Sequence, residues 1–147
     1  MPEVIGIQFA KKNQDGDFGW MIKQDQYKNS LFIFNDDTES INTYQRGGGN
    51  ACVRPYNSNN PNNTVPKSAG IPTGSRKLKS GFKEFDIDTK GIVDEAIQKI
   101  KYLIEEYSYE SIYYSAKKSG KLGTNIFAPC EEVISYITQE IKSLENL

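Results

Sequence analysis

Short apolar runs separated by polar and glycine-rich stretches make up the first half of the chain. Four to eight largely apolar residues bounded by turn residues are typical of a β-strand, which predicts strands over Val4 to Ala10, Phe18 to Ile22 and Leu31 to Phe34. The first two are expected to form a hairpin. Leu31 to Phe34 is apolar at every position, which favours a central strand covered on both faces. A further short strand is predicted over Ala51 to Arg54, directly after three consecutive glycines.

The second half carries two amphipathic patterns with apolar residues every three or four positions. They predict a helix that Asp88 or Thr89 caps and that runs to about Tyr107, and a final helix over Glu131 to Leu144. Ser111 to Ser115 is a predicted strand between them. The order of helix, strand, loop and helix is an α/β signature and places this strand inside the sheet.

Polar and glycine-containing segments connect the two halves. Asn57 to Lys67 consists mainly of Asn, Pro, Ser and Thr and cannot bury apolar area, so a mobile surface loop is expected. Ala69 to Gly74 is expected to be a strand end and turn, and Arg76 to Ser80 a basic loop. At Gly81 and Phe82 we expect a close approach of backbone. At 147 residues, the chain (1–147) is expected to form a single domain with a mixed β-sheet flanked by helices.

Composition narrows the function classes. Lys and Arg (18) and Asp and Glu (19) give a net charge of -1, so duplex nucleic acid is not an expected partner. The absence of histidine excludes Ser-His-Asp and Cys-His catalysis within the chain, and we predict neither a metal site nor a cofactor. Cys52 and Cys130 are too few for a disulfide framework and fit a reduced cytosolic setting. No apolar run approaches a membrane span, so a cytoplasmic location without a membrane partner is expected.

Two glycine-containing loops are candidate phosphate sites. Gly47, Gly48 and Gly49 are consecutive, and bare N–H groups in a tight turn form an anion-binding concavity, although a plain hairpin turn would explain the glycines equally well. The second loop runs from Ser115 to Phe127 and combines glycines, hydrogen-bond donors and an aromatic ring. In open α/β sheets, ligands bind beyond the carboxyl ends of the strands, where such loops converge.

The order of these parts resembles the macro domain, a family of ADP-ribose-binding modules. That family has an apolar strand leading to an Asn-containing loop, then a Gly-Gly-Gly-Val loop, an amphipathic helix, a strand leading to a second glycine loop, and a last helix. The corresponding segments here are Phe32 to Asp36, Gly47 to Ala51, Ile92 to Tyr107, Ile112 to Phe127, and Glu131 to Leu144. The resemblance covers most of the chain from residue 31 onward, in order and type of segment. It implies a macro-like three-layer α/β fold.

The sequence also departs from the family pattern. The usual Asn-Ala-Ala-Asn is Asn35-Asp36-Asp37-Thr38 here, and Asn50 stands where the family has an apolar residue. The early Gly-Asp-Ile element that holds adenine in the family has no clean counterpart.

The resemblance assigns roles to residues of both loops. Gly47 to Asn50 would lie against the distal ribose and one phosphate, and Gly120 to Ile126 against the other phosphate. Asn35 would form hydrogen bonds with the hydroxyls of the distal ribose, and Phe127 would pack beside this ribose. Arg54 could bind a phosphate, or it could pair with a carboxylate. The predicted ligand-binding set is Asn35, Gly47, Gly48, Gly49, Asn50, Arg54, Tyr56, Thr73, Ser115, Gly120, Gly123, Thr124, Asn125, Ile126 and Phe127.

Three functions remain open. The first is a binder of ADP-ribose, or of a cyclic or conjugated derivative, without turnover; a viral anti-defence sponge that sequesters a nucleotide immune signal in the host cytoplasm would need only this pocket. The second is a macro-type ADP-ribosyl hydrolase or phosphatase with Asn35 and Asp36 as the candidate catalytic residues. The third is a protein-interaction module or homo-oligomer in which tyrosines line the interface, unless half of them are core residues. The tyrosines of this third alternative are Tyr102, Tyr107, Tyr109, Tyr113 and Tyr114.

The sequence favours the binder because it shows no clear acid/base pair.

Overall fold

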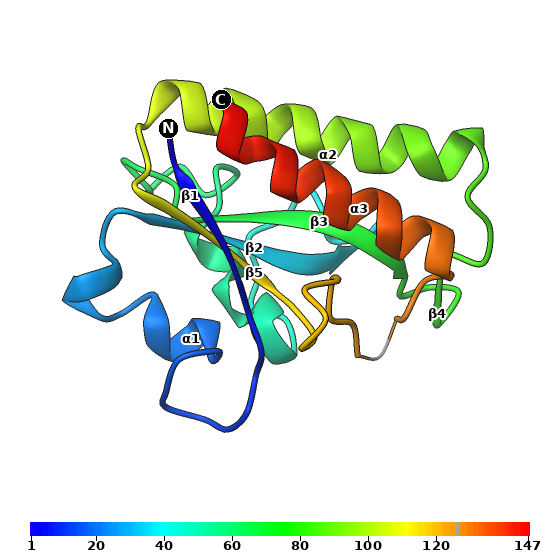
Figure 1. Cartoon of the computed structure of the whole chain (residues 1–147), viewed down its shortest axis with the longest axis horizontal. Helices are drawn as coiled ribbons and strands as arrows, with labels where there is room; N and C mark the ends of the chain where they lie inside the picture. The colour runs from blue at the N-terminus through cyan, green and yellow to red at the C-terminus, as the bar shows by residue number, and fades with distance from the viewer. Residues whose placement is uncertain (126) are drawn as a thin grey trace.

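The computed structural model describes residues 1–125 and 127–147. A five-stranded sheet at its centre has the order β1-β5-β2-β3-β4 and is strongly curled (Figure 1). The pairs β1/β5, β5/β2 and β2/β3 are parallel, whereas β3/β4 is antiparallel. The sheet is therefore mixed and mostly parallel, as expected for an α/β fold. The strands are β1 (Glu3–Ile7), β2 (Ser30–Asp37), β3 (Ser68–Ser75), β4 (Ser80–Gly81) and β5 (Ser111–Ser115).

Two long helices, α2 (Ile87–Glu106) and α3 (Glu131–Ser143), lie together on one side of the sheet (Figure 1). Their apolar faces form one buried cluster with Leu31 and Ile33 of β2. Shorter helical elements pack on the other face. There, Phe32 and Phe34 join a second cluster. These elements are α1 (Phe18–Met21) and the 3₁₀ helices η1 (Asp25–Tyr27) and η2 (Gly49–Tyr56), while η3 (Leu144–Asn146) follows α3.

Successive side chains of β2 alternate between the two buried clusters, which confirms that this strand is central and covered on both faces. The strand between the long helices, β5, also lies inside the sheet as predicted. Both long helices begin and end close to their predicted limits. The cap of α2 is Asp86, whose side chain accepts a hydrogen bond from the Thr89 N–H at 2.8 Å, two residues before the earlier of the predicted caps.

Two predicted strands are helical instead. Phe18–Met21 forms α1, so the predicted N-terminal hairpin is wrong. Asp17 caps this helix, and the Asn50 Oδ1 atom accepts a hydrogen bond from the Phe18 N–H at 3.1 Å. Ala51 to Arg54 lies in η2, which buries Val53 completely against the sheet. Short apolar runs do not distinguish a strand from a buried helical turn, and tertiary packing decides between them.

The small residues of Ala69 to Gly74 belong to a full strand, β3, rather than to a strand end and turn. A Cβ atom on Gly70 would lie 2.5 Å from the Asp36 Oδ2 atom, so the small residue leaves space for a carboxylate on the neighbouring strand. At Gly81, an added Cβ would lie 2.2 Å from the Ala128 carbonyl oxygen, which confirms the predicted close backbone approach.

The asparagine-rich segment 57–67 contains neither helix nor strand. Its side chains nevertheless make specific bonds: the amides of Asn60 and Asn63 both donate to the Pro55 carbonyl oxygen at 2.9 Å, and Asn57 donates to the Thr43 carbonyl at 2.8 Å. The first two bonds hold the loop against η2, and the third ties it to the segment between β2 and η2. Its mobility stays a prediction.

The tyrosines proposed for an interface divide between core and surface. Tyr109, Tyr113 and Tyr114 are buried, Tyr107 is half-buried, and Tyr102 is exposed. Most of this group therefore contributes to packing within the chain.

Candidate functional site

The carboxyl end of β2 organises both glycine-containing loops. The Asn35 Nδ2 atom donates a hydrogen bond to the Gly123 carbonyl oxygen at 2.8 Å. The Gly123 N–H in turn donates to the Ser115 carbonyl at the end of β5, at 2.8 Å. Two parallel strand ends and the second loop are thus bonded together. The Asn35 side-chain nitrogen is therefore used within the chain.

On the opposite face of β2, Arg54 forms a buried ion pair. Its Nη2 atom lies 2.7 Å from Asp36 Oδ1 and 3.8 Å from Asp37 Oδ2, and the arginine side chain is only 4% exposed. The Nη1 atom donates to the Gln45 carbonyl at 2.9 Å. Among the described residues, the buried Arg54 Nε atom has no hydrogen-bond partner. Of the two roles open from the sequence, the structure shows the carboxylate pair.

Burial has the largest effect on the pKa of Asp36 in this ion pair. It raises the pKa of Asp36 above its ordinary value, although the hydrogen bond and charge of Arg54 act in the opposite direction. A buried carboxylate bound to a guanidinium is poorly placed to take a proton from water or substrate. The geometry therefore gives Asp36 a structural role rather than that of a general base.

The three consecutive glycines differ in the space that surrounds them and in backbone conformation. A Cβ on Gly47 would lie 2.8 Å from Arg54 Nη1 and 2.9 Å from Ala51 Cβ, so packing against the ion pair excludes a side chain. At Gly48 and Gly49 an added Cβ would meet nothing within 4 Å. Gly49 has φ of +57°, in the left-handed region. In the described part of the chain, the backbone N–H groups of Gly48 and Gly49 donate to no backbone carbonyl.

The remaining predicted residues are dispersed. Asn50 holds the N-terminus of α1. Its Oδ1 atom accepts a hydrogen bond from the Phe18 N–H, and its Nδ2 atom donates to the Gly16 carbonyl oxygen at 3.4 Å. Thr73 is buried in β3 at 2% exposure. In the second loop, Gly120 has φ of +88°. Ile126 lies outside the described residues. The other predicted residues of this loop are half-buried or exposed: Ser115, Gly123, Thr124, Asn125 and Phe127.

Both loops therefore reach the carboxyl end of β2, but from opposite faces of the strand. Asn35 points to the side of α2 and α3 and holds the second loop. Asp36 points to the side of η2 and, through Arg54, holds the first. A ligand that contacts both loops would have to cross the end of β2.

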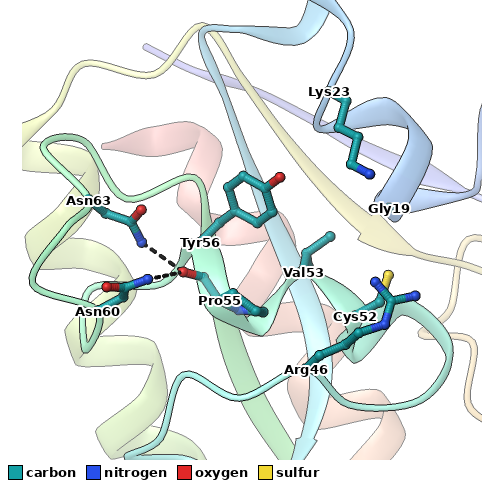
Figure 2. A pocket seen from close by; sticks show the side chains of 9 residues that line it. All are labelled: Gly19, Lys23, Arg46, Cys52, Val53, Pro55, Tyr56, Asn60 and Asn63. Carbon is teal, nitrogen blue, oxygen red and sulfur yellow. Dashed lines mark hydrogen bonds between the residues drawn. The ribbon is translucent and has the colours of Figure 1, made fainter.

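A pocket lies beside the first loop, between α1 and η2 (Figure 2). Its volume is about 380 Å³. Of the predicted site residues, only Tyr56 lines it. Sequence reasoning missed the rest, although Arg46 directly precedes the glycines and was a signal within reach. The lining residues are Gly19, Lys23, Arg46, Cys52, Val53, Pro55, Tyr56, Asn60 and Asn63.

The thiol in this pocket is not activated. Burial raises the pKa of Cys52, and the nearby Asp17 charge raises it further, whereas Arg46 acts to lower it. Thiols react as thiolates, so Cys52 is a weak nucleophile at neutral pH. It is half-buried in the wall of the pocket, and it lies on η2 rather than on the expected strand.

A second hollow, of about 490 Å³, lies at the N-terminal part of α3 and is lined by Phe85, Lys121, Glu131, Glu132, Ser135, Tyr136 and Gln139. Its charges have both signs, and the Lys121 Nζ and Glu131 Oε2 atoms are 3.6 Å apart. Among the described residues, neither pocket is lined by both glycine-containing loops.

Protein-family models, curated proteins and solved structures were compared with the chain, and none matches. In residues 1–125 and 127–147, no three potential ligand side chains gather as a metal site would require. No helix in this part of the chain has the length and apolar character to cross a membrane.

Proposed function

We propose that the chain binds an ADP-ribose-type nucleotide at the carboxyl end of β2, without turnover, and that its fold is macro-like. The observation that carries this proposal is the open turn at Gly48 and Gly49, where an added Cβ meets nothing within 4 Å. Backbone N–H groups in such a turn can bind a phosphate. The diphosphate would lie over this turn, and the second loop, held by Asn35, would approach from the other face of β2.

Three further observations support the proposal. The turn lies at the carboxyl end of a central parallel strand, where α/β sheets commonly bind ligands. Helices α2 and α3 cover one face of the mixed sheet and shorter helical elements the other, as in a three-layer fold (Figure 1). The order of segments resembles the macro domain. A nucleotide sponge in the host cytoplasm is one use of such a site.

The hydrogen bonds that Asp36 already accepts within the chain favour binding over hydrolysis. Its Oδ1 atom accepts hydrogen bonds from Arg54 at 2.7 Å and from the Asp37 N–H at 2.8 Å, and its side chain is buried. A hydrolase would need an accessible group to position water. Asn35, the other candidate, already donates to Gly123.

Titration calorimetry tests the proposal with ADP-ribose, cyclic ADP-ribose and an amino-acid conjugate of ADP-ribose. Gly48→Glu places a carboxylate where the phosphate would lie and should abolish binding. Gly91→Glu is the matched control, because Gly91 is exposed on α2 and an added Cβ there also meets nothing within 4 Å. No heat from any of the three ligands, or equal binding by the two variants, would refute the proposal.

Chromatography of the ligand after incubation separates the binder from the enzyme. We expect ADP-ribose and its conjugate to be recovered unchanged. Release of free ADP-ribose from an ADP-ribosylated protein, lost in Asn35→Ala, would instead establish the hydrolase.

A further inference from the structure

The pocket between α1 and η2 presents two positive charges and no carboxylate among its lining residues. These charges belong to Lys23 and Arg46. Within the described part of the chain, neither side chain forms an ion pair. The chain as a whole has a net charge of -1, so the two cations are a local feature. Two unpaired cations at one hollow favour an anionic ligand.

Asp17 is a carboxylate near this pocket. Asp17 acts on the charge of the Cys52 thiol, but its own oxygens accept hydrogen bonds from the backbone N–H groups of Asn13 and Trp20. It caps the N-terminus of α1 and is not among the residues that line the pocket. Lys23 and Arg46 thus remain available to a ligand.

The rest of the wall is apolar or already hydrogen-bonded. Pro55 and the ring of Tyr56 supply the apolar surface, and the fully buried Val53 lies behind it. Asn60 and Asn63 both donate to the Pro55 carbonyl oxygen, so their amides fix the wall. Figure 2 shows the Lys23 side chain directed toward Gly19, the Arg46 guanidinium beside Cys52, and the Tyr56 ring beyond Val53 from Arg46. The pocket therefore combines two cations with an aromatic wall.

We propose that this pocket binds the phosphate monoester of a compound that carries a planar ring. The phosphate lies between Lys23 and Arg46, and the ring packs on Tyr56. A phosphate monoester carries a charge of about -1.5 to -2 at neutral pH, which two cations match better than they match a monocarboxylate. The guanidinium fork suits two phosphate oxygens, and a tyrosine face suits a planar ring. The volume of about 380 Å³ is at the small end of ligand pockets.

This site goes beyond the nucleotide site proposed at the glycine turn. Its cations and its aromatic wall come from Lys23, Arg46 and Tyr56, and it needs neither Gly48 nor the second loop. A nucleoside monophosphate is the simplest probe, because it combines one phosphate monoester with one ring.

NMR titration with AMP tests the proposal, with ribose 5-phosphate, adenosine and benzoate as comparison ligands. AMP should shift the backbone amide signals of Gly19, Cys52 and Val53 and bind more tightly than any comparison ligand. Lys23→Gln and Arg46→Gln should each weaken AMP binding roughly tenfold, as for loss of one charge-assisted contact. Lys28→Gln and Arg76→Gln are matched controls, since both residues are exposed and lie outside the pocket, and they should leave binding unchanged.

Three results would overturn the proposal: no shift of these amides at millimolar AMP, equal binding of adenosine or benzoate, or equal weakening by the control variants. The experiment also separates this site from the one at the glycine turn. Shifts of the pocket amides that persist in Gly48→Glu would support the pocket whatever happens to ADP-ribose. ADP-ribose binding that Gly48→Glu abolishes and Lys23→Gln spares would support the turn alone.

Discussion

Replacement of Arg54 by methionine is the most informative perturbation of this fold. Methionine preserves much of the side-chain volume but removes the cation that lies 2.7 Å from Asp36 and 3.8 Å from Asp37. It also removes the hydrogen bond to the Gln45 carbonyl and the guanidinium above the Phe34 ring, 5.7 Å from its centroid. Two buried carboxylates would then have no compensating charge.

Breaking a buried ion pair in this way typically costs about 3–5 kcal/mol. We expect a loss in this range at pH 7, because Arg54 is only 4% exposed. Asp36 can escape part of the cost by taking up a proton. Its pKa is already raised in the folded protein by burial, and the loss of Arg54 would raise it further.

The pH dependence follows from this shift. A carboxyl whose pKa is higher in the folded than in the unfolded state binds more protons when folded, so stability falls as pH rises from the unfolded pKa to the folded one. For one group, the slope is at most about 1.4 kcal/mol per pH unit. Arg54→Met should therefore recover at most about 2.7 kcal/mol relative to wild type between pH 7 and pH 5.

Urea denaturation at both pH values measures the effect, with Arg76→Met as the exposed control. The double variant Asp36→Asn/Arg54→Met should lose less than the sum of the single variants, because each charge is costly mainly without the other. A loss below about 1 kcal/mol at pH 7, or no relative recovery at pH 5, would refute this account of the ion pair.

Three further predictions concern nearby groups. Gly47→Ala should destabilise the chain by about 1–3 kcal/mol in thermal unfolding, because the new methyl group would press on the buried guanidinium and on η2, whereas Gly48→Ala should cost much less. Glu39 should show a pKa of about 2 by NMR, because the Ser75 and Thr38 hydroxyls and two backbone N–H groups that follow β3 bind its carboxylate. Its stabilising effect is complete above the ordinary pKa and lost as pH falls toward 2. Asn35→Ala should cost about 1 kcal/mol and speed amide hydrogen exchange at Gly123, and unchanged exchange would contradict the proposed support of the second loop.

The long elements could be predicted because their patterns are repeated over many positions. Helices α2 and α3 each present several apolar residues at helical spacing, and an error at one position does not change that pattern. Leu31 to Phe34 is apolar on both faces, and both faces are covered. Short elements lacked this redundancy. The predicted strands at Phe18 to Ile22 and Ala51 to Arg54 are only four or five residues long, and such short runs fit a strand as well as a helical turn.

The candidate site was only partly predictable for the same reason. The glycine triplet and the asparagine at the end of β2 could be recognised locally. The sequence could not show that Arg54 would reach Asp36, because this pair joins positions that are 18 residues apart. The pocket wall was also missed, since Lys23 and Arg46 come together only when α1 packs against η2.

The sequence by itself determined the α/β class, the two long helices, the central strand and the presence of a turn at the glycine triplet. These features depend on periodicity and on the conformational freedom of single residues, both of which are local. Only the tertiary structure decided that Gly47 faces an ion pair, that Asn35 holds the second loop, and that two cations flank a pocket. Such contacts join distant positions, and their energy depends on burial, which the order of residues alone does not specify.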